Sequence, residues 1–302
     1  MVLIAAALAA ALLFAQPVPV SAQTSPLSAE ARQRFHDEFS SPAQSFRIVA
    51  NVYYVGARNI ASYLITTPQG HFLIDTGTIQ MAPLVLANIQ KLGFRLQDVK
   101  ILLSGHAHFD HVQGHAAVQR ATGARAMAIG EDAAALSSGM DRSPLGDEGW
   151  EPVTIDRVLK DGETLTLGGT TLRAVFTPGH TPGCTTWTTT VQDKEPRPYS
   201  IVFHACGGGP NGGVKVNGNT LFPNLVQDTL RTYAALKMLK PDIYLPMHPE
   251  AYFKDKIDRM RAGERPHPLL VDAGAWTKMI EEAEANFQKR VQDEQKQTSA
   301  AR

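Results

Sequence analysis

The sequence has only two cysteines, no excess charge of either sign and, after its first residues, no long apolar run. Lysine plus arginine and aspartate plus glutamate both number 29, so the formal net charge is zero. No basic stripe favours a nucleic-acid partner. No repeat of solenoid length is present. We therefore expect a globular chain that acts on something other than nucleic acid.

Residues 1–22 differ from the rest of the chain. Residues 1–15 are almost wholly apolar, and Val20-Ser21-Ala22 offers small residues for cleavage, as in a secretory signal peptide. No positive charge precedes Arg32, and an N-terminal membrane anchor is the alternative, although the apolar segment is short for that role. We expect residues 23–302 to form a single catalytic domain, periplasmic or secreted, that is monomeric and free of the membrane after cleavage.

Export would place Cys184 and Cys206 in an oxidising compartment, where they can pair. The alternative is two small buried thiols. Both cysteines flank predicted neighbouring strands, at 185–191 and 199–204, and this favours the disulfide.

The hydrophobic pattern predicts strands that are followed by helices in each half of the chain. The predicted strands are 46–49, 52–55, 62–66, 71–75, 99–104, 124–128, 155–158, 164–167, 170–176, 185–191, 199–204 and 243–245. The predicted helices are 81–92, 115–122, 130–137, 224–239 and about 273–294, and 28–39 is helical or irregular. Two such halves can pack sheet against sheet with helices outside. The expected fold is a four-layer αββα sandwich with its site at the edge of the two sheets.

One short run, 104–111, concentrates three imidazoles and a carboxylate: Ser-Gly-His106-Ala-His108-Phe-Asp110-His111. Few protein cores need that density of polar groups. Neutral imidazole and carboxylate are the ligands of catalytic zinc. Because the run follows a predicted buried strand, we expect its ligands on a loop at the strand's C-terminal end, where α/β proteins place their chemistry.

Two further histidines, His180 and His248, each follow a predicted strand within a proline-rich turn. Alone, His180 is compatible with a turn residue and His248 with a core histidine. Beside the 104–111 run, both become candidate ligands. We assign one metal to His106, His108 and His180, and a second metal to Asp110, His111 and His248. Three protein ligands for each ion leave room for a shared hydroxide.

The remaining histidines have other expected places. We predict His115 beside the site or at the surface, and His204 lining the site. His36, His71 and His267 are expected at the surface.

These residues resemble the metallo-β-lactamase superfamily, and most closely class B, subclass three, of the β-lactamases. The resemblance runs from about Phe46 to Pro249. It depends on Tyr54-Val55-Gly56, Ser62-Tyr63-Leu64-Ile65, Ile74-Asp75-Thr76-Gly77, the 106–111 run, 177–183, Gly218-Asn219 and Phe222-Pro223.

The resemblance implies a zinc-dependent hydrolase with two zinc ions. A metal-bridging hydroxide would attack the amide carbonyl of penicillins, cephalosporins and carbapenems. Asp110 would bind the second zinc and orient the nucleophile, which makes it the catalytic residue. Asp75 would be a buried carboxylate behind the ligands.

The chain departs from subclass three after the predicted strand at 199–204. The family has a serine-rich segment there that helps to bind the substrate carboxylate, whereas residues 203–211 contain no serine. We expect His204, Gly207, Asn211 and Lys215 to take this role. Cys206 stands near a cysteine that binds the second zinc in other subclasses, but His111 already completes that ligand set.

Two other functions stay open. The chain can be a hydrolase of lactones or thioesters, although such relatives carry a Gly-Asp pair where this chain reads Phe203-His204-Ala205-Cys206. It can also be a non-catalytic metal-binding protein, which the complete ligand set disfavours.

Overall fold

The structure is a computed structural model that describes residues 29–145, 148–194, 196–207, 209–249, 254–264 and 269–300. The predicted signal peptide and His267 lie outside the described residues. No helix within these ranges combines the length and apolar character that crossing a membrane requires.

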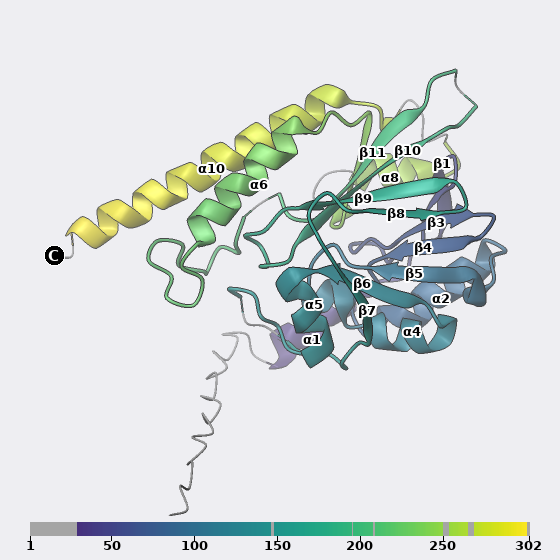
Figure 1. The fold of residues 1–302 in the computed structure, drawn as a ribbon, viewed down its shortest axis with the longest axis horizontal. Coiled ribbons are helices and arrows are strands. Elements are labelled where there is room, and N and C mark those ends of the chain that lie inside the picture. Colours follow the sequence, from purple (N-terminus) through teal and green to yellow (C-terminus); the bar gives the residue numbers. More distant parts are fainter. Residues whose placement is uncertain are drawn as a thin grey trace, which may run out of the picture.

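The described strands form two sheets that face each other (Figure 1). The seven strands of the first sheet follow chain order: β1 (Phe46–Val49), β2 (Val52–Tyr54), β3 (Tyr63–Thr67), β4 (Gly70–Ile74), β5 (Val99–Leu103), β6 (Arg125–Ile129) and β7 (Ile155–Leu159). The second sheet has the order β12 (Ile243–Pro246), β11 (Tyr199–His204), β10 (Thr185–Val191), β9 (Thr170–Phe176) and β8 (Thr164–Leu167). Neighbouring strands are antiparallel from β1 to β4 and parallel from β4 to β7, and β11 pairs parallel with β12.

Helices cover the outer faces of both sheets (Figure 1). The first sheet carries α2 (Met81–Lys91), α4 (His115–Thr122) and α5 (Gly130–Ser138), and the second carries α6 (Leu225–Met238) and α10 (Ala273–Ala300). The other helical segments are α1 (Ala29–Phe39), η1 (Leu96–Asp98), α3 (Phe109–Val112) and α8 (Lys254–Arg261). The predicted four-layer αββα sandwich is confirmed. The pattern missed α8 and ended α10 about two turns early.

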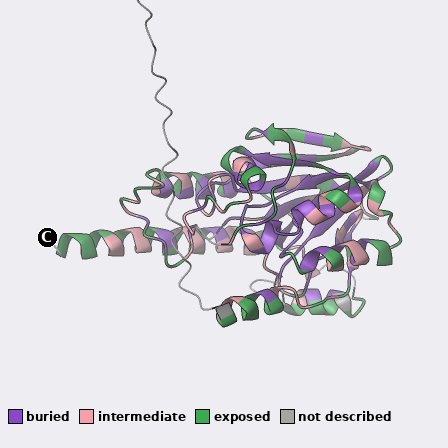
Figure 2. Cartoon of the chain, turned by 90° about the horizontal axis from the view of Figure 1, so that it is seen from below, coloured by how far each residue is buried: buried purple, intermediate pink, exposed green. Residues whose placement is uncertain are grey.

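Two apolar clusters hold these layers together. One lies between the sheets, continues to α6 and α10, and contains large buried rings such as Tyr63, Trp187 and Trp276. The other packs the first sheet against its helices through side chains such as Val85 and Leu136. Figure 2 shows the buried residues along the strands and the exposed ones along the outer helix faces. Burial at about 25 cal/mol per Å² makes these interfaces the main source of stability.

The two sheets are joined directly at the edge where β4, β5, β9 and β12 end. The backbone N–H of Thr185 donates to the Gly105 carbonyl at 2.7 Å, and that of Ala61 donates to the Met247 carbonyl at 2.9 Å. The indole of Trp187 also donates to the Ser104 carbonyl at 3.0 Å. This edge is therefore a fixed platform for the loops that follow the strands.

Candidate metal centre

The first predicted ligand set is brought together. His106 and His108 follow β5, whereas His180 comes from the turn after β9. One ring nitrogen of each lies within 4.8 Å of the others, and the ring centroids are 4.5 to 4.9 Å apart. Three separate imidazoles thus face one point.

The state of these rings fits a metal ion. Burial lowers the pKa of His108 to about 4 and that of His180 to about 3, so both are neutral at pH 7 with free lone pairs. Both ring nitrogens of His106 are buried and have no hydrogen-bond partner among the described residues. An unpaired buried polar group costs about 1–3 kcal/mol, a penalty that metal coordination removes.

The second predicted set is equally close. The Nε2 atom of His111 lies 3.3 Å from Oδ2 of Asp110 and 3.1 Å from Nε2 of His248, and this last nitrogen is 3.5 Å from the same carboxylate oxygen. Burial opposes ionisation of Asp110, but the two imidazoles hold the pKa of its carboxyl well below its usual range. One carboxylate and two imidazoles form a donor set that zinc accepts.

One helical turn places residues that are close in sequence in two different ligand sets. Asp110 and His111 lie in α3 rather than in the expected loop. The N–H groups of His111 and Val112 donate to the His108 carbonyl at 3.0 and 3.1 Å, which turns the chain back on itself. Because the turn closes immediately after His108, Asp110 and His111 lie beside His106.

Asp75, at the end of β4, lies behind His111. Its Oδ1 accepts the Gly105 N–H at 2.6 Å, and its Oδ2 lies 3.1 Å from His111 Nδ1. This contact to Nδ1 leaves Nε2 of His111 directed at Asp110. Carboxylates commonly orient metal-binding histidines in this way.

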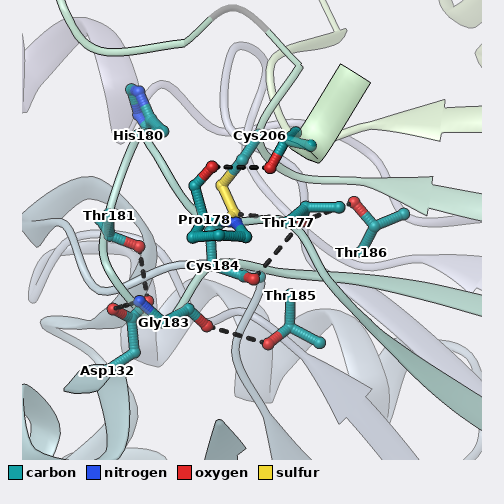
Figure 3. Close-up of a disulfide and its surroundings, with 12 residues drawn as sticks. Asp132, Thr177, Pro178, His180, Thr181, Gly183, Cys184, Thr185, Thr186 and Cys206 are labelled. Carbon is teal, nitrogen blue, oxygen red and sulfur yellow. Dashed lines mark hydrogen bonds between the residues drawn. A yellow bond between two sulfur atoms is a disulfide. The ribbon is translucent and has the colours of Figure 1, made fainter. Parts of the chain in front are cut away.

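Asp132, in the first turn of α5, was not predicted from the sequence. Its Oδ2 accepts the Ala107 N–H at 2.9 Å and the Thr181 hydroxyl at 2.7 Å, and its Oδ1 accepts the Gly183 N–H at 2.7 Å (Figure 3). Burial raises the pKa of Asp132 to about 7, against the lowering effect of these donors. Ala107 stands between two ligands and Thr181 follows the third. One buried carboxylate therefore connects the chain segments that carry the whole first set.

The predicted disulfide between Cys184 and Cys206 is confirmed, with Cα atoms 6.3 Å apart (Figure 3). It ties the His180 turn to the loop after β11. Three residues beyond Cys206, the Gly209 carbonyl lies 2.9 Å from His180 Nδ1, which leaves Nε2 of that ring for a metal. In this form Cys206 is bonded to sulfur and is not a metal ligand.

The sequence profile of the metallo-β-lactamase superfamily matches residues 55–248, which contain both ligand sets. The chain belongs to the metallo-β-lactamase superfamily.

Several solved structures are similar over nearly their whole length. Native FEZ-1 metallo-β-lactamase from Legionella gormanii is 36% identical with a TM-score of 0.80, over 85% of this chain and 98% of that one. MEM-A1, a subclass B3 metallo-β-lactamase from a soil metagenome library, is 30% identical with a TM-score of 0.79, over 86% and 99%. These matches confirm the resemblance to subclass three, and this metallo-β-lactamase homologue is a hydrolase of the superfamily.

Two curated relatives are more distant. A probable metallo-hydrolase from Burkholderia pseudomallei is 32% identical over 111 residues, and a hydroxyacylglutathione hydrolase from Rhodospirillum rubrum is 29% identical over 103 residues. Each match covers 34–35% of this chain and about a third of the relative's length.

The four candidate substrate-binding residues of this metallo-β-lactamase homologue lie in different environments. His204 is buried against Trp276 with ring centroids 5.2 Å apart, and burial lowers its pKa to about 4. The ring packs so closely on Gly207 that no side chain fits at that position. Asn211 is half-buried and Lys215 is exposed in the loop that follows.

The C-terminal helix α10 holds that glycine-rich loop. The Arg290 guanidinium donates to the Pro210 carbonyl at 2.7 Å and the Asn211 carbonyl at 3.1 Å. The Glu294 carboxylate accepts the N–H groups of Val216 and Asn217 at 3.0 and 2.9 Å. Between these two attachments, Gly212 and Gly213 are exposed with open space around them.

Two histidines expected at the surface are buried instead. His36 lies 2.8 Å from a carboxylate oxygen of Glu148 and packs against Phe109. The Nδ1 atom of His71 accepts the Thr67 N–H at 3.3 Å. Both predictions were wrong because these side chains find hydrogen-bond partners on packed elements. His115 is also buried and lies 2.8 Å from the Thr76 hydroxyl.

Proposed function

We propose that this chain is a β-lactamase that uses two zinc ions to hydrolyse the amide bond of penicillins, cephalosporins and carbapenems. The observation that carries the proposal is the pair of three-residue ligand sets, which share one edge of the sandwich. Similarity to β-lactamases over nearly their whole length supports the substrate class.

Each ligand set would hold one of the two ions. Neutral His106, His108 and His180 would hold one ion, and Asp110, His111 and His248 the other. Bound zinc would supply an acidified water as nucleophile and a Lewis acid for the amide carbonyl.

Asp110 carries the orienting role in this proposal. With its pKa well below the usual range, its carboxylate stays ionised and accepts hydrogen bonds at neutral pH. Its Oδ2 lies at the centre of the second set, within 3.5 Å of both imidazoles. From there it can accept a hydrogen bond from the attacking water and orient it.

Recognition of the substrate carboxylate is assigned to the segment 204–215. Lys215 supplies a positive charge on an exposed side chain, and Asn211 and the backbone N–H of Gly207 are further donors. His204 is the weakest member because it is buried and uncharged at neutral pH. In this arrangement, the positive charge of Lys215 and the backbone N–H donors would take the place of the subclass three serines.

A thioester or lactone hydrolase is the second candidate, favoured by the partial similarity to the hydroxyacylglutathione hydrolase. The expected bridging carboxylate is missing from 203–206, which argues against it.

The disulfide and the apolar N-terminal segment support a periplasmic or secreted location.

The test is hydrolysis of nitrocefin and meropenem by the purified, zinc-loaded chain, with and without EDTA. We expect turnover that EDTA abolishes and that Asp110→Asn lowers at least tenfold with an unchanged circular dichroism spectrum. Lack of β-lactam turnover by protein that binds two zinc ions would contradict the proposed substrate, and a panel of lactones and thioesters would then identify the alternative.

A further inference from the structure

The disulfide lies against the candidate metal centre. A ring nitrogen of His106 and the Sγ atoms of Cys184 and Cys206 all lie within 4.8 Å of one another. All three side chains are buried, with at most 2% of each residue exposed. Because neither nitrogen of His106 has a hydrogen-bond partner among the described residues, this imidazole is free to bind metal.

The same three residues would form a different kind of site if the sulfur–sulfur bond were broken. Two thiolates and one imidazole form a three-ligand set that zinc accepts with its fourth position left for water, and soft thiolates select zinc and copper(I) over harder cations. In the disulfide the two sulfur atoms are bonded to each other. Reduction is therefore the step that would create the donor set.

We propose that His106, Cys184 and Cys206 form a reduction-dependent metal site for a thiolate-preferring cation such as Zn²⁺. A dithiol or phosphine supplies two electrons to the sulfur–sulfur bond and is itself oxidised, and each sulfur gains one proton. Binding of the cation then releases both thiol protons and leaves two thiolates and neutral His106 as ligands.

The new site would compete with the zinc centre. The inference rests on the proposed function in one respect, since His106 also belongs to the first ligand set. A neutral imidazole has a lone pair on only one of its nitrogens, so His106 cannot bind both ions at once. The disulfide also joins the His180 turn to the loop that carries Gly209 (Figure 3). Reduction would thus draw His106 away and release His180 from its partner, and the chain would lose activity under reducing conditions.

The first test uses cobalt(II) as the probe metal with the full chain, oxidised or reduced by a phosphine. We expect a thiolate-to-cobalt charge-transfer band only in the reduced chain. Cys184→Ser and Cys206→Ser should each weaken the band at least twofold. The double variant should bind cobalt without the band, whether or not reductant is present.

The second test measures β-lactam hydrolysis with two zinc equivalents per chain and no zinc in excess. Reduction should lower the turnover of the natural chain at least tenfold and leave that of the double serine variant within twofold of its own unreduced value. A reduced chain that binds cobalt without a sulfur band overturns the inference, as does one that unfolds and is not refolded by cobalt. Either result leaves the proposed function intact, because that function is tested on the oxidised chain.

Discussion

The candidate metal centre has two halves, its first and second ligand sets, and these are positioned by different forces. His106, His108 and His180 lie on segments that Asp132 connects through backbone and hydroxyl hydrogen bonds, and a disulfide closes the same region. Asp110, His111 and His248 are instead coupled by charge, with Asp75 behind them.

Exposure does not separate the two sets. Each has two buried members and one partly exposed histidine, His180 in the first set and His248 in the second. The two sets differ in protonation. The first is preformed as neutral imidazoles, whereas His111 in the second carries a proton that a metal ion must displace.

The largest effect is expected from His180→Ala, which removes one of three ligands from the preformed half. Hydrolysis should fall by more than about 100-fold. Loss of a residue that only orients a ligand costs about 10–100-fold, and loss of a ligand itself should cost more. The second half should keep its zinc. Metal analysis after gel filtration and turnover of nitrocefin measure both. Normal metal content with retained turnover would contradict the ligand assignment.

Asp132→Ala should come next. It leaves donors from Ala107, Thr181 and Gly183 without their acceptor, at about 1–3 kcal/mol for each buried group that finds no other partner. We expect a 10–100-fold weaker affinity for zinc in the first half. Competition with a chromophoric chelator measures affinity, and urea denaturation of the metal-free chain measures stability.

A gentler pair of variants serves as the control for Asp132. Thr181→Val removes a single donor at nearly constant volume and should weaken zinc binding by about tenfold, whereas Thr181→Ser should restore it. Equal affinities for the two variants would show that Asp132 stabilises the fold without positioning the ligands.

Proton release should distinguish the halves at pH 7. Burial lowers the pKa of His111, but Asp110 and Asp75 outweigh it and raise the pKa to about 10, so this ring is protonated before metal binds. The second half should release about one proton per ion, and its affinity should rise about tenfold per pH unit towards pH 10.

The first ligand set should release no proton when it binds metal at pH 7. With the pKa values of His108 and His180 lowered to about 4 and about 3, its affinity should be flat above about pH 5 and fall in stronger acid. Calorimetry in two buffers of different ionisation enthalpy counts the protons, and the His180→Ala chain isolates the second half. If the two ligand sets released equal numbers of protons on metal binding, the predicted difference in their protonation would be wrong.

The smallest effect is expected from Phe39→Leu. The ring of Phe39 contacts His248 edge-on, with centroids 6.1 Å apart, and such contacts contribute about 0.5–1.5 kcal/mol. Zinc affinity of the second half should fall by a few-fold. Phe35→Leu is the matched control, because Phe35 is 40% exposed and its ring packs at a tilt against Phe39, with centroids 5.8 Å apart. An identical loss in both variants would point to α1 as a whole.

The sequence predicted most strands, the disulfide and the six residues that meet in the two candidate ligand sets, because each depends on local pattern or on residue type. It did not predict Asp132. An acidic residue in the first turn of a helix is ordinary, and its acceptor role depends on N–H groups 25 and 51 residues away in the chain. The burial of His36 was missed for the same reason, since its partner Glu148 is 112 residues distant.

The short helix α3 could not be predicted from the sequence for a different reason. Its four residues are too few for a helical period, and its place is set by the carbonyl of His108 and by the carboxylate of Asp75 behind His111. The residues that meet at the candidate site were therefore easier to predict than their geometry.

The glycine-rich loop has a consequence for how this protein can diversify. Arg290 and Glu294 fasten its two sides to α10, while Gly212 and Gly213 face open space. New side chains can therefore be added there without repacking the core, unlike at Gly183, where any Cβ would collide with the backbone of Ile129 and Asp132. Under antibiotic selection, we expect adaptive substitutions to accumulate at positions 212 and 213 and to be purged at 183.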